Sequence, residues 1–154
     1  MKNIETKRQY LIVWLYGIAI LHFVVGVLLA WGSSLDYFDA YNHEVLSGFF
    51  SEISQSESRF QAWWLSLFGA TLQNIGIFMG AMIYVGNLYR NKHVWLWMIA
   101  GVLVWAPQDI LISLQAGVES HLWLDSIALL LILPPLISLW NLDRKNSIAE
   151  SENK

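Results

Sequence analysis

Four long apolar segments constrain this chain more than any other feature of its sequence. They cover residues 10–31, 62–84, 94–115 and 122–140, and the charged residues gather in the stretches between them. A helix needs about 20 largely apolar residues to cross the hydrocarbon core of a bilayer. Of the 154 residues, 56% are hydrophobic and only 14% are charged, whereas soluble domains carry about 25% charged residues. The sequence therefore predicts an all-α, polytopic membrane protein folded as an antiparallel four-helix transmembrane bundle.

The distribution of Lys and Arg predicts the orientation of this bundle. Eight of the nine basic residues lie before the first segment, between the second and third, or after the fourth, and Arg59 alone lies elsewhere. Lys and Arg are enriched in cytoplasmic loops, so both termini are predicted to be cytoplasmic, in what we expect to be a bacterial inner membrane. The first segment exceeds the apolar core of a signal peptide, which is about 7–15 residues long, so we expect it to be a retained span.

The chain is predicted to form one membrane domain over residues 1–145, with a polar tail at 146–154 that we expect to be disordered. The outer loop, residues 32–61, holds aromatic and aliphatic residues at roughly helical spacing with acids between them. This pattern is typical of a short amphipathic helix that lies at the interface or caps the bundle. The sequence contains no cysteine, which excludes disulfides and thiolate ligands, and no cofactor is predicted.

The same loop raises the question of a metal site. If it is helical, four residues with possible ligand atoms share one face: Asp36, Asp39, His43 and Glu44. Carboxylate and imidazole groups at this spacing can bind a divalent ion. The alternative, which we favour, is that these residues form the solvated face of an amphipathic helix.

The stretch "LVWAPQDILISL" places Asp109 inside the third apolar segment. An ionisable side chain in hydrocarbon is costly, so it normally faces the bundle and finds a partner there. In the predicted orientation, the polar residues of all four segments fall between the midplane and the outer face. Together with one aromatic neighbour they form the predicted ligand site: His22, Gln73, Asn74, Trp105, Gln108, Asp109, His121 and Asp125.

Prolines within two of the segments support a cavity at this depth. Pro107 precedes Asp109 by two residues, and Pro134 and Pro135 interrupt the fourth segment. A proline inside a helix bends it and frees a carbonyl group, and bent helices separate from their neighbours. The sequence therefore favours a pocket for a small hydrophobic molecule such as a quinone, a sterol-like lipid or an aromatic compound.

Two other functions fit the same residues. Gly76 and Gly80 form a stripe of small residues that suits packing against a partner membrane protein or another copy of the chain, as in an accessory subunit. Alternatively, Asp109 and His22 act as a general acid–base pair of an enzyme with an apolar substrate. Ordinary hydrogen bonding between helices also explains several of the polar residues, Gln73 among them. A net charge of −3, with basic residues accounted for by topology, excludes nucleic acid as a partner.

Two segments carry a resemblance to known families. "FGATLQNIGIFMG" and "LDSIALLLILPPLISLW" resemble the small four-span bacterial proteins grouped as DoxX-like and as the X-type protein of biphenyl operons. This resemblance implies four spans with both termini inside, and no particular activity. "LYGIAILHFVVG" and "QAWWLSLF" are similar to the sterol-isomerase and sigma-2-receptor superfamily, which implies a sterol-sized pocket lined by intramembrane acids.

Overall fold

The structure, a computed structural model, describes the backbone of residues 2–152 and the side chains of residues 3–145. This part of the chain is helical and contains no strand, which confirms the all-α prediction. A single 3-10 turn, η1 (Asp36–Phe38), precedes the short helix α2. The helices are α1 (Lys2–Gly32), α2 (Asp39–Ser47), α3 (Gln55–Tyr89), α4 (Lys92–Gln115) and α5 (Ser120–Glu152).

Within the described residues, four helices are long and apolar enough to cross a membrane, namely α1, α3, α4 and α5. Each contains one predicted segment; α1, α3 and α5 extend beyond both of its ends, and α4 extends beyond its start only. Helix α3 begins well before residue 62 because Ser54 and Glu57 form a capping box, in which each side chain bonds the other's backbone N–H. Helix α5 continues to Glu152, through part of the segment 146–154 that the sequence predicts to be disordered. Residues 153–154 lie outside the described part of the chain.

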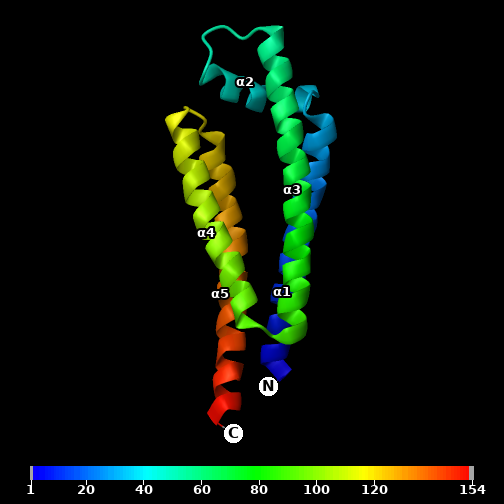
Figure 1. The fold of residues 1–154 in the computed structure, drawn as a ribbon, viewed down its shortest axis with the longest axis vertical. Helices are drawn as coiled ribbons and strands as arrows, with labels where there is room; N and C mark the ends of the chain where they lie inside the picture. The colour runs from blue at the N-terminus through cyan, green and yellow to red at the C-terminus, as the bar shows by residue number, and fades with distance from the viewer. Residues whose placement is uncertain (1, 153–154) are drawn as a thin grey trace.

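The long helices are arranged as two pairs, α1 with α3 and α4 with α5 (Figure 1). Both chain termini lie at the same end of the molecule, where the two pairs meet, and the pairs separate toward the end that carries α2 (Figure 1). Within the first pair the backbones touch through glycines. A Cβ atom on Gly69 would lie 2.4 Å from the backbone nitrogen of Ala30, and one on Gly26 would lie 2.6 Å from the carbonyl oxygen of Gly69. Small residues thus allow the close approach of these two helices.

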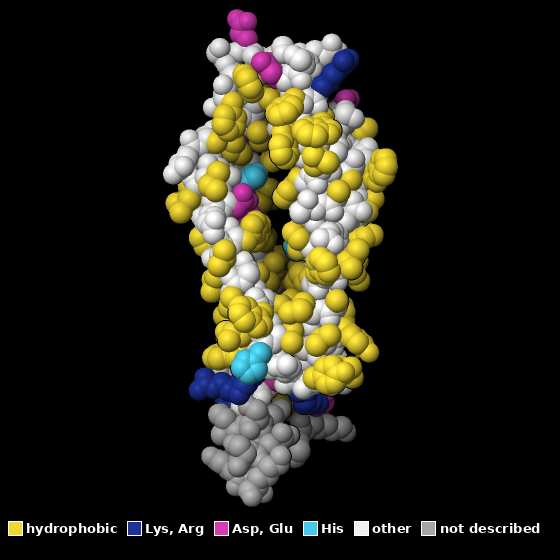
Figure 2. All heavy atoms as spheres, in the orientation of Figure 1, with side chains coloured by type: hydrophobic (Ala, Val, Ile, Leu, Met, Phe, Trp, Pro, Cys, Tyr) yellow, Lys and Arg dark blue, Asp and Glu magenta, His cyan; other side chains and the backbone are white. Residues whose placement is uncertain are grey.

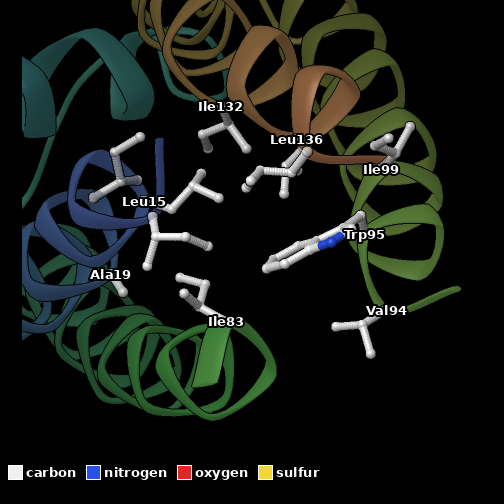
Figure 3. Close-up of a cluster of buried hydrophobic side chains, with 11 residues drawn as sticks. Leu15, Ala19, Ile83, Val94, Trp95, Ile99, Ile132 and Leu136 are labelled. Carbon is white, nitrogen blue, oxygen red and sulfur yellow. The ribbon is translucent and has the colours of Figure 1, made fainter. Parts of the chain in front are cut away.

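The hydrophobic core joins the two pairs near the termini. Figure 3 shows Trp95 of α4 reaching toward Leu15 of α1 and Ile83 of α3. Its indole lies on Gly86, where a Cβ atom would come within 2.7 Å of the ring. Buried residues from all four long helices make up this core: Ile12, Leu15, Ile18, Ala19, Ile83, Val94, Trp95, Ile99, Ile132, Leu136 and Leu139.

A buried polar group lies beside this core, and we call it the basal cluster: Arg8, Asn87, Trp95 and Asp143. The guanidinium of Arg8 donates to both carboxylate oxygens of Asp143, at 3.2 and 3.3 Å. Arg8 also donates to the side-chain oxygen of Asn87, and the indole N–H of Trp95 donates to Asp143 at 2.8 Å. Arg8 is 3% exposed and Asp143 1%. The basal cluster therefore links α1, α3, α4 and α5 through charged groups removed from solvent.

The double proline of α5 is accommodated by a side chain from α1. Pro135 has no N–H, so the carbonyl of Leu131, four residues earlier, lacks its usual helical donor. The indole N–H of Trp14 donates to this carbonyl at 3.0 Å. Trp14 thus satisfies a group that the proline frees and connects the two helix pairs at mid-height.

Helix α2 connects the pairs at the opposite end of the molecule (Figure 1). The side-chain amide of Asn42 donates to the carbonyl of Ser33 at the end of α1, at 3.2 Å. On the other side, the Glu44 carboxylate accepts a 2.9 Å bond from the backbone N–H of Ser120, the first residue of α5. Gly48 lies so close to the carbonyl oxygen of Ala116 that a Cβ atom there would be 2.2 Å from it. Helix α2 is the short helix that the loop spacing predicts, and it bridges the ends of the two pairs.

Candidate functional site

The two helix pairs leave a gap between them over the middle of the molecule, and we call this gap the central crevice. Direct contacts between the pairs are much fewer than contacts within each pair. Figure 2 shows the crevice as a dark opening between the two halves, with hydrophobic side chains along its walls. Acidic and histidine side chains also lie beside the opening (Figure 2). The crevice is bounded by the hydrophobic core at one end and by α2 at the other.

Polar side chains from three helices meet around His121 near the α2 end of the crevice. The Nε2 atom of His121 lies 2.9 Å from the hydroxyl of Tyr41, whose ring is parallel to the imidazole with 5.9 Å between centroids. The Nδ1 atom lies 2.9 Å from the hydroxyl of Ser113 and 3.2 Å from a carboxylate oxygen of Asp109. Both ring nitrogens are therefore engaged, one toward α2 and the other toward α4.

Asp125 completes this group one helical turn after His121. Its carboxyl group lies against that of Asp109 and is 5% exposed. The Oδ2 atom of Asp125 is buried and has no hydrogen-bond partner among the described residues. An unsatisfied buried polar atom costs about 1–3 kcal/mol, and such atoms in a native fold usually have a functional reason. We call Tyr41, Asp109, Ser113, His121 and Asp125 the His121 cluster.

Charges on α2 and burial determine how protons are placed in this cluster. Burial, together with the negative charges of Asp109 and Glu44, raises the pKa of Tyr41 to about 12. Tyr41 therefore keeps its proton at neutral pH and donates it to Nε2 of His121. In the neutral tautomer that accepts this bond, His121 carries its hydrogen on Nδ1, which lies 2.9 Å from the Ser113 hydroxyl and 3.2 Å from the Asp109 carboxylate. The hydrogen bond from the Ser120 N–H lowers the pKa of Glu44, which keeps that carboxylate ionised beside the cluster.

Three of the eight predicted site residues, Asp109, His121 and Asp125, come together in this cluster. Gln73 instead donates to the carbonyl of Gly26 at 3.2 Å and so joins α3 to α1. It acts as a contact between helices, one of the alternatives that the sequence left open.

The remaining predicted site residues make local contacts or are exposed. Gln108 donates to the carbonyl of Val104 in its own helix at 2.8 Å. Asn74 is exposed, and Trp105 is 40% exposed. Asn74, Trp105 and Gln108 form no hydrogen bond with the described side chains of the His121 cluster.

The predicted pairing of His22 with Asp109 is not formed. The Nδ1 atom of His22 lies 2.8 Å from the carbonyl oxygen of Ile18 in its own helix, and the histidine beside the Asp109 carboxylate is His121, at 3.2 Å. The two residues belong to different helix pairs, on opposite sides of the crevice. The sequence predicted a similar depth in the membrane for His22 and Asp109, but similar depth did not determine which histidine lies beside Asp109.

The candidate metal ligands of the outer loop do not converge. Glu44 is directed toward the start of α5, while Asp39 and His43 line an open hollow of about 990 Å³ between α2 and the beginning of α3. Over the described residues, no group of three or more His, Asp or Glu side chains is placed to hold a metal ion. The solvated face of an amphipathic helix accounts for Asp36 and its neighbours.

Sequence reasoning missed two members of the cluster. Ser113 follows Asp109 by one helical turn, a spacing that indicates a shared face but not a shared partner. Tyr41 has the spacing of an apolar anchor of the amphipathic helix, and nothing in the sequence indicates that its hydroxyl meets His121.

Comparison with protein-family models, with curated proteins and with solved structures finds no match for this chain. The case for its function therefore rests on this geometry.

Proposed function

We propose that this chain is an integral membrane protein that binds a small, largely apolar molecule in the central crevice. The observation that carries the proposal is the buried Oδ2 atom of Asp125, which has no hydrogen-bond partner among the described residues and lies on one of the two helix pairs that flank the central crevice. Ligand sites typically combine apolar walls with a few polar groups that fix orientation. The crevice supplies the walls, and the His121 cluster supplies the polar groups at one end.

Membrane insertion is supported by the outer surface of the helices. All four long helices expose large apolar side chains, for example Trp31 at 86%, Trp97 at 72% and Leu130 at 73%. Exposed apolar surface on this scale is not found on soluble monomers and suits contact with acyl chains. We therefore propose an antiparallel four-helix bundle in an inner membrane, with both termini cytoplasmic and α2 on the outer side. Reporter fusions after residues 45 and 91 test this orientation, and an outside signal from residue 91 would contradict it.

The free atom at Asp125 also restricts the ligand. A carboxylate oxygen accepts hydrogen bonds, so the matching ligand donates one from a hydroxyl or N–H group at the end of an apolar body. A sterol-like alcohol or a hydroxylated aromatic compound has this form. A quinone presents only acceptors, and would have to bond the donors of the cluster, such as the Ser113 hydroxyl.

Native mass spectrometry of protein purified in mild detergent from its own membrane tests the proposal. The wild type should retain a small apolar molecule. Asp125→Leu removes the unpaired oxygen atom and keeps the volume of the side chain similar, so it should reduce retention of the ligand. Ile127 is 54% exposed on the same helix, and Ile127→Phe should leave retention unchanged. A wild type that repeatedly carries no molecule, with this region filled by its own side chains, would refute the proposal.

The two alternative functions lose part of their support. A Cβ atom on Gly76 would lie 2.8 Å from the carbonyl oxygen of Ala19. Gly76, one of the two glycines of the small-residue stripe, therefore already packs against α1 of the same chain. Gly80 alone, with open space around it, is left for a partner protein or a second copy. An enzyme with acid–base chemistry would have to use Asp109 with His121, since His22 bonds its own helix. Purification of a stable, monodisperse protein without a partner would speak for ligand binding over the accessory-subunit function.

A further inference from the structure

A series of polar groups in close contact runs from α2 to the acids beside His121: the Tyr41 hydroxyl, the His121 imidazole and the carboxyl groups of Asp109 and Asp125. We propose that Tyr41 and His121 relay protons between the aqueous side at α2 and the carboxyl groups of Asp109 and Asp125. This activity goes beyond ligand binding and does not require a ligand in the crevice. It gives the buried carboxyl group of Asp125, through half-buried Asp109, a defined route for exchanging protons with solvent.

The distances along this series suit proton transfer. The hydroxyl of Tyr41 lies 2.9 Å from Nε2 of His121, and Nδ1 lies 3.2 Å from a carboxylate oxygen of Asp109. Both lengths are within the reach required for transfer between side chains, about 2.6–3.2 Å. Asp125 lies against Asp109, so the series continues to the buried acid with the unpaired oxygen. An imidazole can accept a proton at one nitrogen while it donates from the other.

The transfer is balanced in bonds and protons. A proton from solvent binds the oxygen of Tyr41 as the original O–H bond breaks and a new N–H bond forms at Nε2 of His121. The N–H bond at Nδ1 then breaks, and an O–H bond forms on the carboxylate of Asp109. The net result is one proton moved inward, with His121 left in its other tautomer. The reverse transfers, or rotation of the imidazole ring, restore the starting state.

The charged groups around His121 favour protons at this position. Tyr41 and Glu44 face it from α2, Asp109 from α4, and Asp125 lies beside it on α5. Three of these four groups are carboxylic acids, and the described Arg ion pairs, Arg8 with Asp143 and Arg90 with Glu5, involve none of them. Glu44 is only partly buried, so its carboxylate attracts protons to the solvent side of the relay.

The test is a rapid acid jump on ligand-free protein in lipid nanodiscs, followed by infrared spectroscopy of the carboxylic acid C=O stretch. Asp109→Asn and Asp125→Asn identify the bands of the half-buried acid and of the buried one. Tyr41→Phe removes the relaying hydroxyl and keeps the ring. It should slow protonation of these acids by at least about tenfold, a small part of the effect typical of positioned acid–base groups, without changing the final amplitude. Tyr37 is 87% exposed and contacts the Phe38 ring, so Tyr37→Phe should keep the wild-type rate.

A second variant keeps the test decisive if Tyr41→Phe does not fold, as judged by circular dichroism. His121→Gln retains hydrogen bonding at this position but cannot pass a proton through a ring, and it should slow the acids in the same way. A wild-type rate in the folded variants would overturn the proposal. A faster rate would overturn it as well, because water would then reach the acids directly. Since no ligand is used, this outcome is independent of the mass-spectrometric test of ligand binding.

Discussion

The basal cluster makes the most demanding prediction about stability. Asp143→Ala removes the one carboxylate among the described residues to which the buried guanidinium of Arg8 donates hydrogen bonds, at 3.2 and 3.3 Å. It also removes the acceptor of the Trp95 indole N–H. Asn87 remains as a neutral partner of Arg8. The variant therefore leaves a positive charge in the interior with one side-chain amide as its main hydrogen-bond partner.

The expected cost follows from the burial of both partners. The side chains of Arg8 and Asp143 are 4% and 0% exposed, and breaking a buried pair by removing one member costs about 3–5 kcal/mol. Replacing both members with apolar residues, as in Arg8→Met with Asp143→Leu, removes the stranded charge. The double variant should therefore recover most of the loss, apart from about 1–3 kcal/mol for the Trp95 N–H left without an acceptor.

Unfolding in mixed micelles with an increasing fraction of denaturing detergent, followed by far-UV circular dichroism, measures these differences. The structure offers a matched control at the same end of the molecule. Arg90 and Glu5 form an ion pair of 2.8 Å whose side chains are 47% and 44% exposed. Because exposed pairs contribute little, Glu5→Ala should barely move the midpoint. If Asp143→Ala is no more destabilising than Glu5→Ala, or if the double variant is worse than the single one, our reasoning about burial is wrong.

Three further predictions concern packing, the carbonyl freed by Pro135 and pH. Gly69→Ala should separate α1 from α3 and destabilise the protein in the same unfolding assay, because its Cβ would meet backbone atoms, whereas Gly80→Ala has open space and should be neutral. Trp14→Phe should cost about 0.5–1.5 kcal/mol, the usual contribution of one hydrogen bond; the cost should shrink when Pro135→Ala restores the helical donor, and an unchanged cost in this double-mutant cycle would contradict the assignment. The pKa of Glu44 is lowered from its ordinary 4.5, so its docking of α2 is fully present above that pH and is lost as pH falls through the lowered value. The protection of the Ser120 amide, taken as its intrinsic exchange rate divided by the rate observed at the same pH, should fall with this loss in the wild type, and Glu44→Gln should make this protection independent of pH.

The sequence was sufficient to predict the four long helices, because long apolar runs require helical backbone in a membrane. It was less informative about where the helices end. Helix α3 begins at Gln55 because of a capping box that lies outside the apolar run. A hydropathy pattern does not detect side-chain caps, so it does not predict where α3 begins. It also does not predict that α5 continues into a polar stretch.

The candidate site was predicted in part, for a similar reason. Asp109 and Asp125 stand out because a carboxyl group inside an apolar segment is rare. Tyr41 does not stand out, since a tyrosine in an amphipathic helix usually serves as an apolar anchor. The partner of Asp109 depends on which helices pair, and periodicity within each helix does not contain that information. Arg8 is read from sequence as one more basic residue near a membrane face, although the fold buries it.

The pairing of consecutive helices has a consequence for how the chain is assembled. Helices α1 to α3 form one hairpin and α4 with α5 forms the other, and the backbone crosses between them once, at a turn where Arg90 adopts a left-handed conformation (φ 46°). Each hairpin holds its own internal contacts, while the ion pair between Arg8 and Asp143 joins residues 135 positions apart. The protein is thus organised like a heterodimer whose two subunits happen to be fused. Cutting the chain after Arg90 and expressing the halves together should give two hairpins that insert separately and then recombine.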